Sequence, residues 1–572
     1  MSPQPHLINT VALEVHTGRL GDLSSLQADL SDLVWQQALP QMAALFDGLV
    51  AADTVVRLDQ VVITLPRLAA HELSEQFVPA LLAALAQHLQ DVLAGYAPEA
   101  GTVLRDRQPQ PESDGETLRY FLRHGRLPWW ATETDWETWL RRWQVSLVAS
   151  PNEAAALRSL LRTQPAARHR LATQFPDAFQ HQAVLHLNPT WLGWRSLLTQ
   201  AHQLIAAIHA IQPLRDLTRT ALHHRAWEIL WMLISRAQPS DALPVGRWMQ
   251  QWLPSFLAIA GQQLIPPQPS PPEDTAIAHP PSPSAAAAAA SPAPHFDPRA
   301  SIATLITQTL GRDRAPWLAA LSQVERPPTP IPRPTVADRP DPSPAAIAPP
   351  WPPRAEPLPP LPTVPESGSA AAAPPPTEAV PTRPDTPTNP ARDRAADSPL
   401  TAAEAQTGIA LNQAGIVLLH PFLRRYFAAI DLLTADQFRD EPSQHAAIAL
   451  VHYLATRQLD PPEYELVLPK LLCGWPLNAP VEAVSLPQAA LDEAEQLLQS
   501  AIDHWDALKH TRPDGLREGF LQRQGKLTQI GDRAWKLQVE KQAIDILLTR
   551  LPWGISMVKL PWMNALLTVE WT

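Results

Sequence analysis

The stretch Pro357-Leu358-Pro359-Pro360-Leu361-Pro362 lies in the part of the chain that decides how the whole sequence is divided. Proline fixes φ and lacks an amide hydrogen, so this stretch is excluded from a helix interior and from a central strand. Residues 266–400 hold 37 of the 65 prolines, and alanine runs such as residues 285–290 lie between the proline clusters. This composition predicts a long Pro/Ala-rich spacer, disordered or polyproline II, between folded parts.

The composition of the whole chain limits its class. A length of 572 residues is enough for three to four domains of about 150 residues each. The formal net charge of -11 argues against nucleic acid and anionic lipid as partners. A single cysteine, Cys473, excludes an intrachain disulfide and favours a reducing compartment, where we expect it to be a buried core residue. The first residues lack an export signal, and no apolar stretch reaches the roughly 20 residues that span a bilayer, so we expect a soluble, cytoplasmic protein without direct membrane insertion.

The pattern of apolar and polar residues over 1–100 predicts an N-terminal β-α-β-α module. Apolar and polar residues alternate over 7–16, which is typical of a half-buried strand. A helical pattern follows over 22–49, a second strand is predicted over 55–65, and a second helix over 72–93.

The sequence pattern over residues 101–265 predicts a Trp-rich helical region. Eleven of the 20 tryptophans lie between residues 116 and 264, several at helical spacing, such as Trp139 and Trp143. This spacing favours a buried core over an aromatic binding platform. Within the spacer, residues 301–324 predict two short amphipathic helices broken near Pro316, either a docking motif or a small helical hairpin.

The sequence pattern over residues 401–572 predicts an α+β domain. Gly531-Asp532-Arg533 separates two strand patterns and predicts a hairpin. All six lysines lie in this domain, and interspersed acidic residues favour a solvated surface over a basic partner-binding patch. Helical patterns cover 421–430, 444–456, 463–473 and 487–509. The predicted fold class is therefore mainly α with small α+β terminal modules, in a multidomain chain interrupted by the spacer.

Motifs that carry chemistry are incomplete in this sequence. The stretch 519–527, GFLQRQGKL, has five residues between its glycines where a phosphate-binding loop needs four. His71-Glu72 begins like a zinc-protease helix, but Glu75 stands where the second histidine belongs. Histidine pairs such as His223 and His224 do not form a closed ligand set. We therefore predict no enzyme activity, no cofactor and no metal, and a hydrolase with a site assembled in space is the third-ranked alternative.

A resemblance to a known family is carried by residues 412–423, NQAGIVLLHPFL, which are similar to the opening motif of contractile injection system tape measure proteins. The N-terminal part, including residues 120–130, YFLRHGRLPWW, resembles the start of the same family. Gly519 departs from the pattern, which often has a small polar residue there, and residues 266–400 match no part of it. Further similar motifs follow in order at 452–456, 463–474, 515–523 and 551–563.

The resemblance implies a structural tape measure protein that sets inner-tube length and aids assembly of a contractile, phage-tail-like particle. Its implied partners are inner tube, baseplate or tube-terminating proteins, with room for several copies per particle. It implies assembly in the cytoplasm and a place within the particle tube. The alternative function is a non-measuring scaffold or adaptor, whose flexible linker lets two folded modules bind separate partners.

Candidate partner-binding residues lie near the C-terminus. Pro552 and Pro561 bracket an interval that suits a short edge strand, and edge strands are prone to pair with other chains. The alternative is that the tryptophans of this stretch close the core of the domain. The candidates are Trp553, Ile555, Met557, Lys559 and Trp562, with His420 and Phe422 of the family motif.

Overall fold

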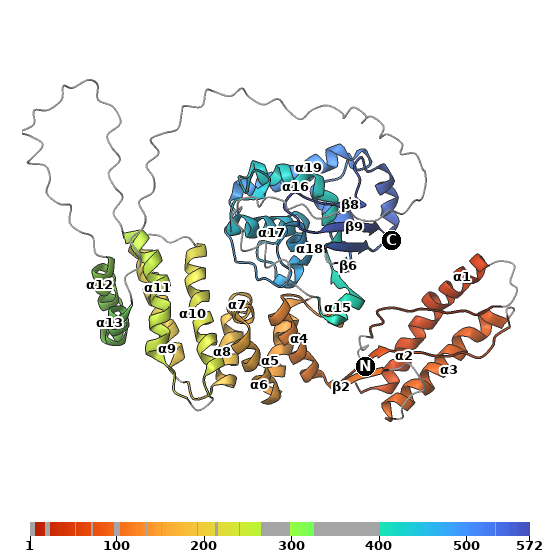
Figure 1. Cartoon of the computed structure of the whole chain (residues 1–572), viewed down its shortest axis with the longest axis horizontal. Helices are drawn as coiled ribbons and strands as arrows, with labels where there is room; N and C mark the ends of the chain where they lie inside the picture. The colour runs from red at the N-terminus through yellow and green to blue at the C-terminus, as the bar shows by residue number, and fades with distance from the viewer. Residues whose placement is uncertain are drawn as a thin grey trace, which may run out of the picture. The chain divides into compact units, whose positions relative to one another are not determined.

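A computed structural model describes residues 6–17, 23–264, 298–324 and 400–571, apart from gaps at 52, 70–71, 96–102, 132–134, 150, 192, 212–215, 239–240 and 532 (Figure 1). The predicted spacer, 266–400, lies outside these residues except for 298–324 and residue 400. Helices dominate the described part, and its strands form one five-stranded and two two-stranded sheets. The predicted fold class, mainly α with small α+β modules in a multidomain chain, is confirmed.

The N-terminal module combines two antiparallel strands with packed helices. Strand β1 pairs with strand β2, and helix α3 packs against the helical stretch that opens the module. The apolar side chains between these helices form a small core of their own, which includes Leu33, Phe77 and Leu85. The bounds are α1 Leu23–Asp32, the π-helical turn η1 Leu33–Ala38, α2 Leu39–Leu49, β1 Thr54–Gln60, α3 Leu73–Leu93 and β2 Val103–Pro109.

The predicted β-α-β order of this module is wrong. Residues 6–17 form no strand, and Leu7, Val11 and Val15 are each about half exposed. Strand β1 ends at Gln60, five residues earlier than predicted, and its partner β2 lies beyond the predicted module boundary at residue 100. Alternation of apolar residues makes a strand only where a neighbouring strand completes its backbone hydrogen bonds, and in the described residues β1 takes β2 as that neighbour.

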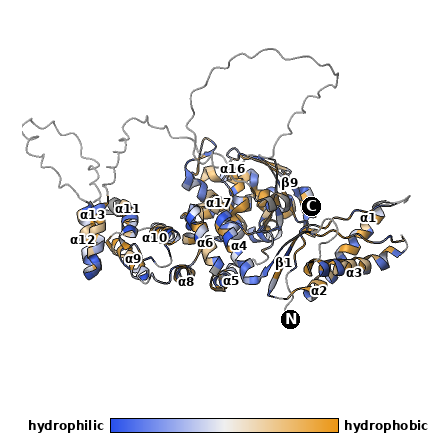
Figure 2. Cartoon of the chain, turned by 60° about the horizontal axis from the view of Figure 1, so that its bottom comes forward, coloured by the Kyte–Doolittle hydropathy of each residue, from blue (hydrophilic) through white to orange (hydrophobic). Residues whose placement is uncertain are grey.

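The Trp-rich region is helical, as predicted. Its helices α4 to α11 carry hydrophobic and hydrophilic residues side by side, as Figure 2 shows, and bury their apolar faces in one continuous core. Trp143, Trp227, Trp231 and Trp252 are fully buried in that core, which confirms the packing interpretation. The bounds are α4 Gln110–His124, α5 Trp136–Ala149, α6 Pro151–Thr163, α7 Pro165–Gln174, α8 Asp177–Leu187, α9 Trp194–Ile211, α10 Asp216–Arg236 and α11 Val245–Leu264.

The helical island inside the spacer forms a hairpin that belongs to this core. Helices α12 (Pro298–Leu310) and α13 (Arg314–Gln323) are joined by a 3-10 turn, η3 (Gly311–Asp313), and pack on α9 and α11. Trp317 is fully buried, with ring centroids 6.1 Å from Trp248 and 5.6 Å from Trp252. The break lies at Gly311, whose φ is 50°, and not at Pro316, because a proline in the first turn of a helix lacks only an amide that would be unpaired there. We call α4 to α13 the helical region.

The C-terminal domain, residues 400–571, packs helices against one face of a mixed sheet. The strand order is β3-β6-β7-β9-β8, with β7 and β9 parallel and the other neighbours antiparallel. The predicted hairpin is present as β6 and β7, and the predicted helical patterns are confirmed. The bounds are α15 Ala402–Thr407, β3 Ile409–Leu411, η5 Ala414–Leu419, α16 His420–Ala429, β4 Leu433–Thr434, β5 Gln437–Phe438, α17 Glu441–Thr456, η6 Glu463–Leu466, α18 Val467–Leu472, α19 Gln488–His504, η7 Asp506–Leu508, α20 Pro513–Leu516, η8 Arg517–Leu521, β6 Gly525–Gly531, β7 Ala534–Val539, η9 Ala543–Arg550, β8 Met557–Val558 and β9 Leu566–Trp571.

Two glycines let distant motifs of this domain pack closely. A Cβ on Gly415 would overlap the carbonyl oxygen of Phe520, and one on Gly474, whose φ is 68°, would lie 2.6 Å from the carbonyl oxygen of Trp562. Both positions therefore require glycine, because a methyl group has no room against a fixed backbone. The motifs at 412–423 and 515–523 thus contact each other directly.

Candidate functional site

The candidate residues at the end of the chain lie on an exposed sheet edge. Strand β8 pairs with β9 on one side and is the last strand of the sheet on the other. Met557 is 66% exposed and Lys559 is also exposed, whereas Val558 between them is fully buried. The backbone therefore presents alternate side chains outward, as a strand does. An edge of this kind leaves backbone donors and acceptors available to a further strand.

Three further candidates, Trp553, Phe422 and His420, make contacts within the domain. Trp553 donates its indole N–H to the Leu418 carbonyl at 3.0 Å, and its ring centroid lies 5.1 Å from that of Phe422. His420 is half-buried, which lowers its pKa, and its Nδ1 lies 2.9 Å from the Val417 carbonyl.

Two candidates face the core of the domain rather than solvent. Ile555 is half-buried and packs against the domain core. Trp562 is buried and donates to the Leu472 carbonyl at 2.8 Å, a role in core closure. Met557 and Lys559 are therefore the candidates that stand free for a partner, and their binding role stays a prediction.

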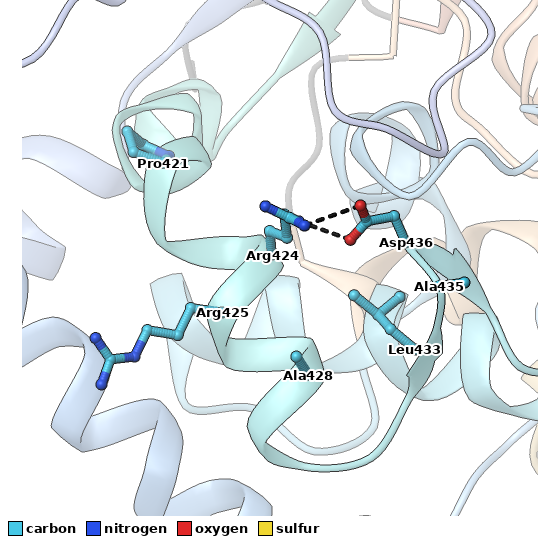
Figure 3. Close-up of a pocket in the computed structure, with 7 residues that line it drawn as sticks. All are labelled: Pro421, Arg424, Arg425, Ala428, Leu433, Ala435 and Asp436. Carbon is cyan, nitrogen blue, oxygen red and sulfur yellow. Dashed lines mark hydrogen bonds and ion pairs between the residues drawn. The ribbon is translucent and has the colours of Figure 1, made fainter. Parts of the chain in front are cut away.

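An open pocket of about 490 Å³ lies on the outer side of α16 (Figure 3). The Arg424 guanidinium donates to both carboxylate oxygens of Asp436, at 2.7 and 2.8 Å, across the pocket. Arg425 points away from this pair, and Pro421 and Ala428 supply apolar lining (Figure 3). This lining holds a surface ion pair without a nucleophile or a catalytic base beside it, so it resembles a contact surface more than an active site.

A second arrangement, which joins the helical region to the C-terminal domain, is fully buried. Arg170 on α7 donates Nε and Nη2 to the two carboxylate oxygens of Glu463, at 2.8 and 2.9 Å. Glu463 also accepts from Lys470 Nζ at 2.5 Å. Arg170 is 0% exposed, and Glu463 and Lys470 are each 1% exposed. Arg170 Nη1 also donates to the Leu122 carbonyl at the end of α4, at 3.0 Å.

A second ion pair closes the same interface. Arg126 donates Nε and Nη2 to the carboxylate of Glu404 on α15, with the Nη2 bond at 2.8 Å, and donates Nη1 to Asn478 Oδ1. The Asn478 carbonyl accepts from Arg170 at 2.6 Å and thereby links the two pairs. Glu404 is held in place by a reciprocal capping box with Thr401. We call these six residues, Arg126, Arg170, Glu404, Glu463, Lys470 and Asn478, the polar seam.

The charges of the polar seam hold each other ionised. Burial opposes ionisation of Glu404, but the hydrogen bonds and charge of Arg126 keep its pKa at about 2. Burial acts on Glu463 in the same way, and Arg170 and Lys470 nevertheless hold its pKa below the usual value. Burial lowers the pKa of Lys470 to about 8 against the attraction of Glu463. Glu404, Glu463 and Lys470 are therefore predominantly charged at neutral pH.

Gly125 makes the polar seam geometrically feasible. It ends α4 in the left-handed region, with φ 71°, and donates to the Phe121 carbonyl at 2.7 Å. A Cβ there would overlap Glu463 Oε1 and lie 2.7 Å from Arg170 Nη2. Glycine is therefore needed both for the backbone turn and for the space that the ion pair occupies.

The polar seam was not predicted from the sequence, and it corrects one expectation. Lys470 is a buried ion-pair partner instead of a solvated surface residue. The seam joins the helical region directly to the C-terminal domain. The signals in the sequence were charges set in apolar motifs, Arg126 in YFLRHGRLPWW and Glu463 with Lys470 in EYELVLPKLLCG.

Other polar clusters in the described residues do not amount to a catalytic or metal centre. His202 Nε2 lies 2.5 Å from His223 Nδ1, and His223 Nε2 lies 2.9 Å from Asp177 Oδ1, between α8, α9 and α10. Among the described residues, no group of three or more His, Cys, Asp or Glu is arranged to hold a metal ion. Cys473 is buried, as predicted, and burial raises its pKa. None of the described helices is both long and apolar enough to cross a membrane.

Comparison with known proteins links both sides of the polar seam to one family. A model of the family described as contractile injection system tape measure protein matches residues 5–571. The match includes the helical region, the spacer and the C-terminal domain. Neither the comparison with curated proteins nor that with solved structures gave a match.

Proposed function

The chain belongs to the contractile injection system tape measure protein family, and from this premise we propose that it sets the length of the inner tube and aids assembly of the particle. The role is structural, and no reaction is assigned to any residue. The observation that carries the proposal is the match over residues 5–571, which includes both ends of the chain and the spacer between them.

The exposed edge of the C-terminal domain is the part that we assign to a partner. Met557 on β8 and Lys559 directly after it are both exposed, and the outer edge of β8 has no neighbouring strand in the described residues. A strand from a tube, baseplate or tube-terminating protein would extend this sheet through backbone hydrogen bonds, with Met557 as an apolar contact. The pocket beside Arg424 lies on α16 of the same domain and provides a second contact surface.

The spacer is the part that we assign to length. Polyproline II rises about 3.1 Å per residue, so roughly 60 residues in that conformation span about 190 Å. Val324 and Leu400, the described residues on either side of residues 325–399, belong to the two parts of the chain that the polar seam joins. The contour length of the spacer can therefore set a distance only when the seam is open. Assembly in the cytoplasm and a place inside the tube are parts of the same proposal.

Deletion of residues 330–390 tests the ruler directly. Particles assembled with the shortened chain should have shorter tubes in electron micrographs, by up to about 190 Å if the spacer is stretched as polyproline II. A chain in which 330–390 is replaced by a shuffled sequence of the same composition is the matched control and should give tubes of normal length. Tubes of unchanged length with the deletion would refute the assignment of length to the spacer.

The polar seam favours one alternative, a non-measuring adaptor. Its buried ion pairs hold the helical region and the C-terminal domain together, as an adaptor with two adjacent binding surfaces requires. The deletion separates the two functions, because an adaptor tolerates a shorter linker as long as both surfaces can still bind. Normal particles of normal length would then indicate the adaptor.

A further inference from the structure

The polar seam joins two bodies whose apolar cores are separate. The helical region and the C-terminal domain each enclose a continuous core of buried residues. In the described part of the chain, Tyr464 is the apolar side chain of the C-terminal domain that packs against the helical core. Its ring centroid lies 6.3 Å from that of Phe121 and 5.9 Å from that of Trp136. Separation of the two bodies would therefore expose mostly charged and polar groups, which water can solvate.

The two sides of the seam carry complementary charges. The helical region contributes Arg126 and Arg170, and the C-terminal domain contributes Glu404 and Glu463. Each arginine binds its carboxylate through two nitrogen atoms, which fixes the relative orientation of the two side chains. Both arginines also bind Asn478, so the acceptor surface is specific to this domain. We call the surface of the helical region that carries Arg126 and Arg170 the arginine face. Its contacts fit a C-terminal domain of this sequence, whereas an unrelated acidic surface would not supply the same acceptors.

The covalent link between the two sides is long. Residues 325–399 connect them, and a random coil of that many residues would have a root-mean-square end-to-end distance of about 50 Å. Such a linker favours closure within one chain in dilute solution, but the effective concentration that it supplies falls as its length grows. When copies are crowded, the C-terminal domain of a neighbouring chain competes for the same arginine face.

We propose that the polar seam is an exchangeable interface between copies of this chain, in which the helical region of one copy binds the C-terminal domain of the next. The acceptor surface needs no rearrangement, because it is the one already formed within the chain. Exchange converts closed chains into linked ones and frees each spacer to extend between two bodies. The proposal concerns binding between chains and does not depend on length control.

Complementation between two intact chains tests the proposal. One chain carries Arg126→Gln and Arg170→Gln, and the other carries Glu404→Gln and Glu463→Gln, so neither can close its own seam. A mixture retains one unmodified arginine face and one unmodified carboxylate face. We expect the mixture to form a heterodimer in sedimentation velocity, whereas each variant alone stays at least about a hundredfold weaker in self-association. Failure of the mixture to associate, with both chains folded by circular dichroism, overturns the proposal.

Two further variants protect the test against loss of the fold. The single changes Arg126→Gln in one chain and Glu404→Gln in the other remove only the second ion pair and leave Arg170 with Glu463 intact. The mixture of these two chains should again associate more strongly than either chain alone, by a smaller factor than for the double variants. Glu495→Gln is the matched control, because Glu495 is paired with Arg517 within the C-terminal domain at 2.5 Å, outside the seam. A mixture of the Glu495→Gln chain with the unmodified chain should sediment like the unmodified chain alone, because both chains keep a complete seam, and preferential association in that mixture would also overturn the proposal.

Discussion

Removal of the Glu463 carboxylate is the perturbation whose cost the structure determines most clearly. Glu463 lies between Arg170 and Lys470, and all three side chains are at most 1% exposed. The change Glu463→Gln leaves two buried cations without their counter-ion. Loss of one partner of a buried ion pair typically costs about 3–5 kcal/mol of the free energy of unfolding. We therefore expect a loss of this size in urea unfolding followed by tryptophan fluorescence.

The same structure predicts that removal of the whole cluster costs much less. Replacement of a buried ion cluster by apolar residues of similar volume is often neutral or stabilising. The triple variant Arg170→Met, Glu463→Leu, Lys470→Met should therefore unfold within about 1 kcal/mol of the unmodified chain or above it. Arg424→Ala is the surface control, because Arg424 is 61% and Asp436 44% exposed, and such pairs contribute at most about 1 kcal/mol. A loss below 1 kcal/mol for Glu463→Gln, or a triple variant as unstable as the single one, would refute this reasoning.

Three more predictions concern other positions. Gly125→Ala should lower the free energy of unfolding by about 2 kcal/mol or more, because alanine is strained at φ 71° and its methyl group overlaps Glu463; an unchanged urea midpoint contradicts this. Trp317→Ala should cost about 3–5 kcal/mol and make the α12–α13 hairpin sensitive to limited proteolysis, whereas continued protection would show that Trp317 does not hold it. Burial lowers the pKa of His124 and of His445 to about 4, so the unfolded chain binds protons first and stability should fall as pH drops from about 6.5 toward 4; constant stability between pH 7 and 4.5 contradicts this.

Local patterns predicted the helices and the hairpin correctly because the determinants lie within each element. The tryptophans of α5, α10 and α11 recur at helical spacing, and all of them except the partly buried Trp136 are buried. The β6–β7 hairpin is fixed by the turn at Gly531. The strand predicted over 7–16 failed for the opposite reason, since a strand depends on a neighbour that the local pattern does not specify. Strand β9 and its parallel pairing with β7 were missed because the crossover between them depends on tertiary packing.

The polar seam could not be predicted because its partners are far apart in the sequence. Arg126 and Glu404 are separated by 278 positions, and Arg170 and Glu463 by 293. A single sequence shows each as one charge near apolar residues, and most such charges lie on solvated surfaces. The resemblance at 120–130 and 463–474 identified the right segments without showing that they meet. Among the predicted partner residues, Trp562 proved buried for a related reason, since tryptophan is common both in cores and at interfaces.

The central claim is that this chain controls tube length through its spacer, and the dependence of length on residue number tests it most directly. Electron micrographs of particles built with the spacer shortened by 330–390, unmodified, or lengthened by a second copy of 330–390 give three tube lengths. The account predicts a linear increase with one slope, at most about 3.1 Å for each added residue. Three equal lengths in well-formed particles would contradict it.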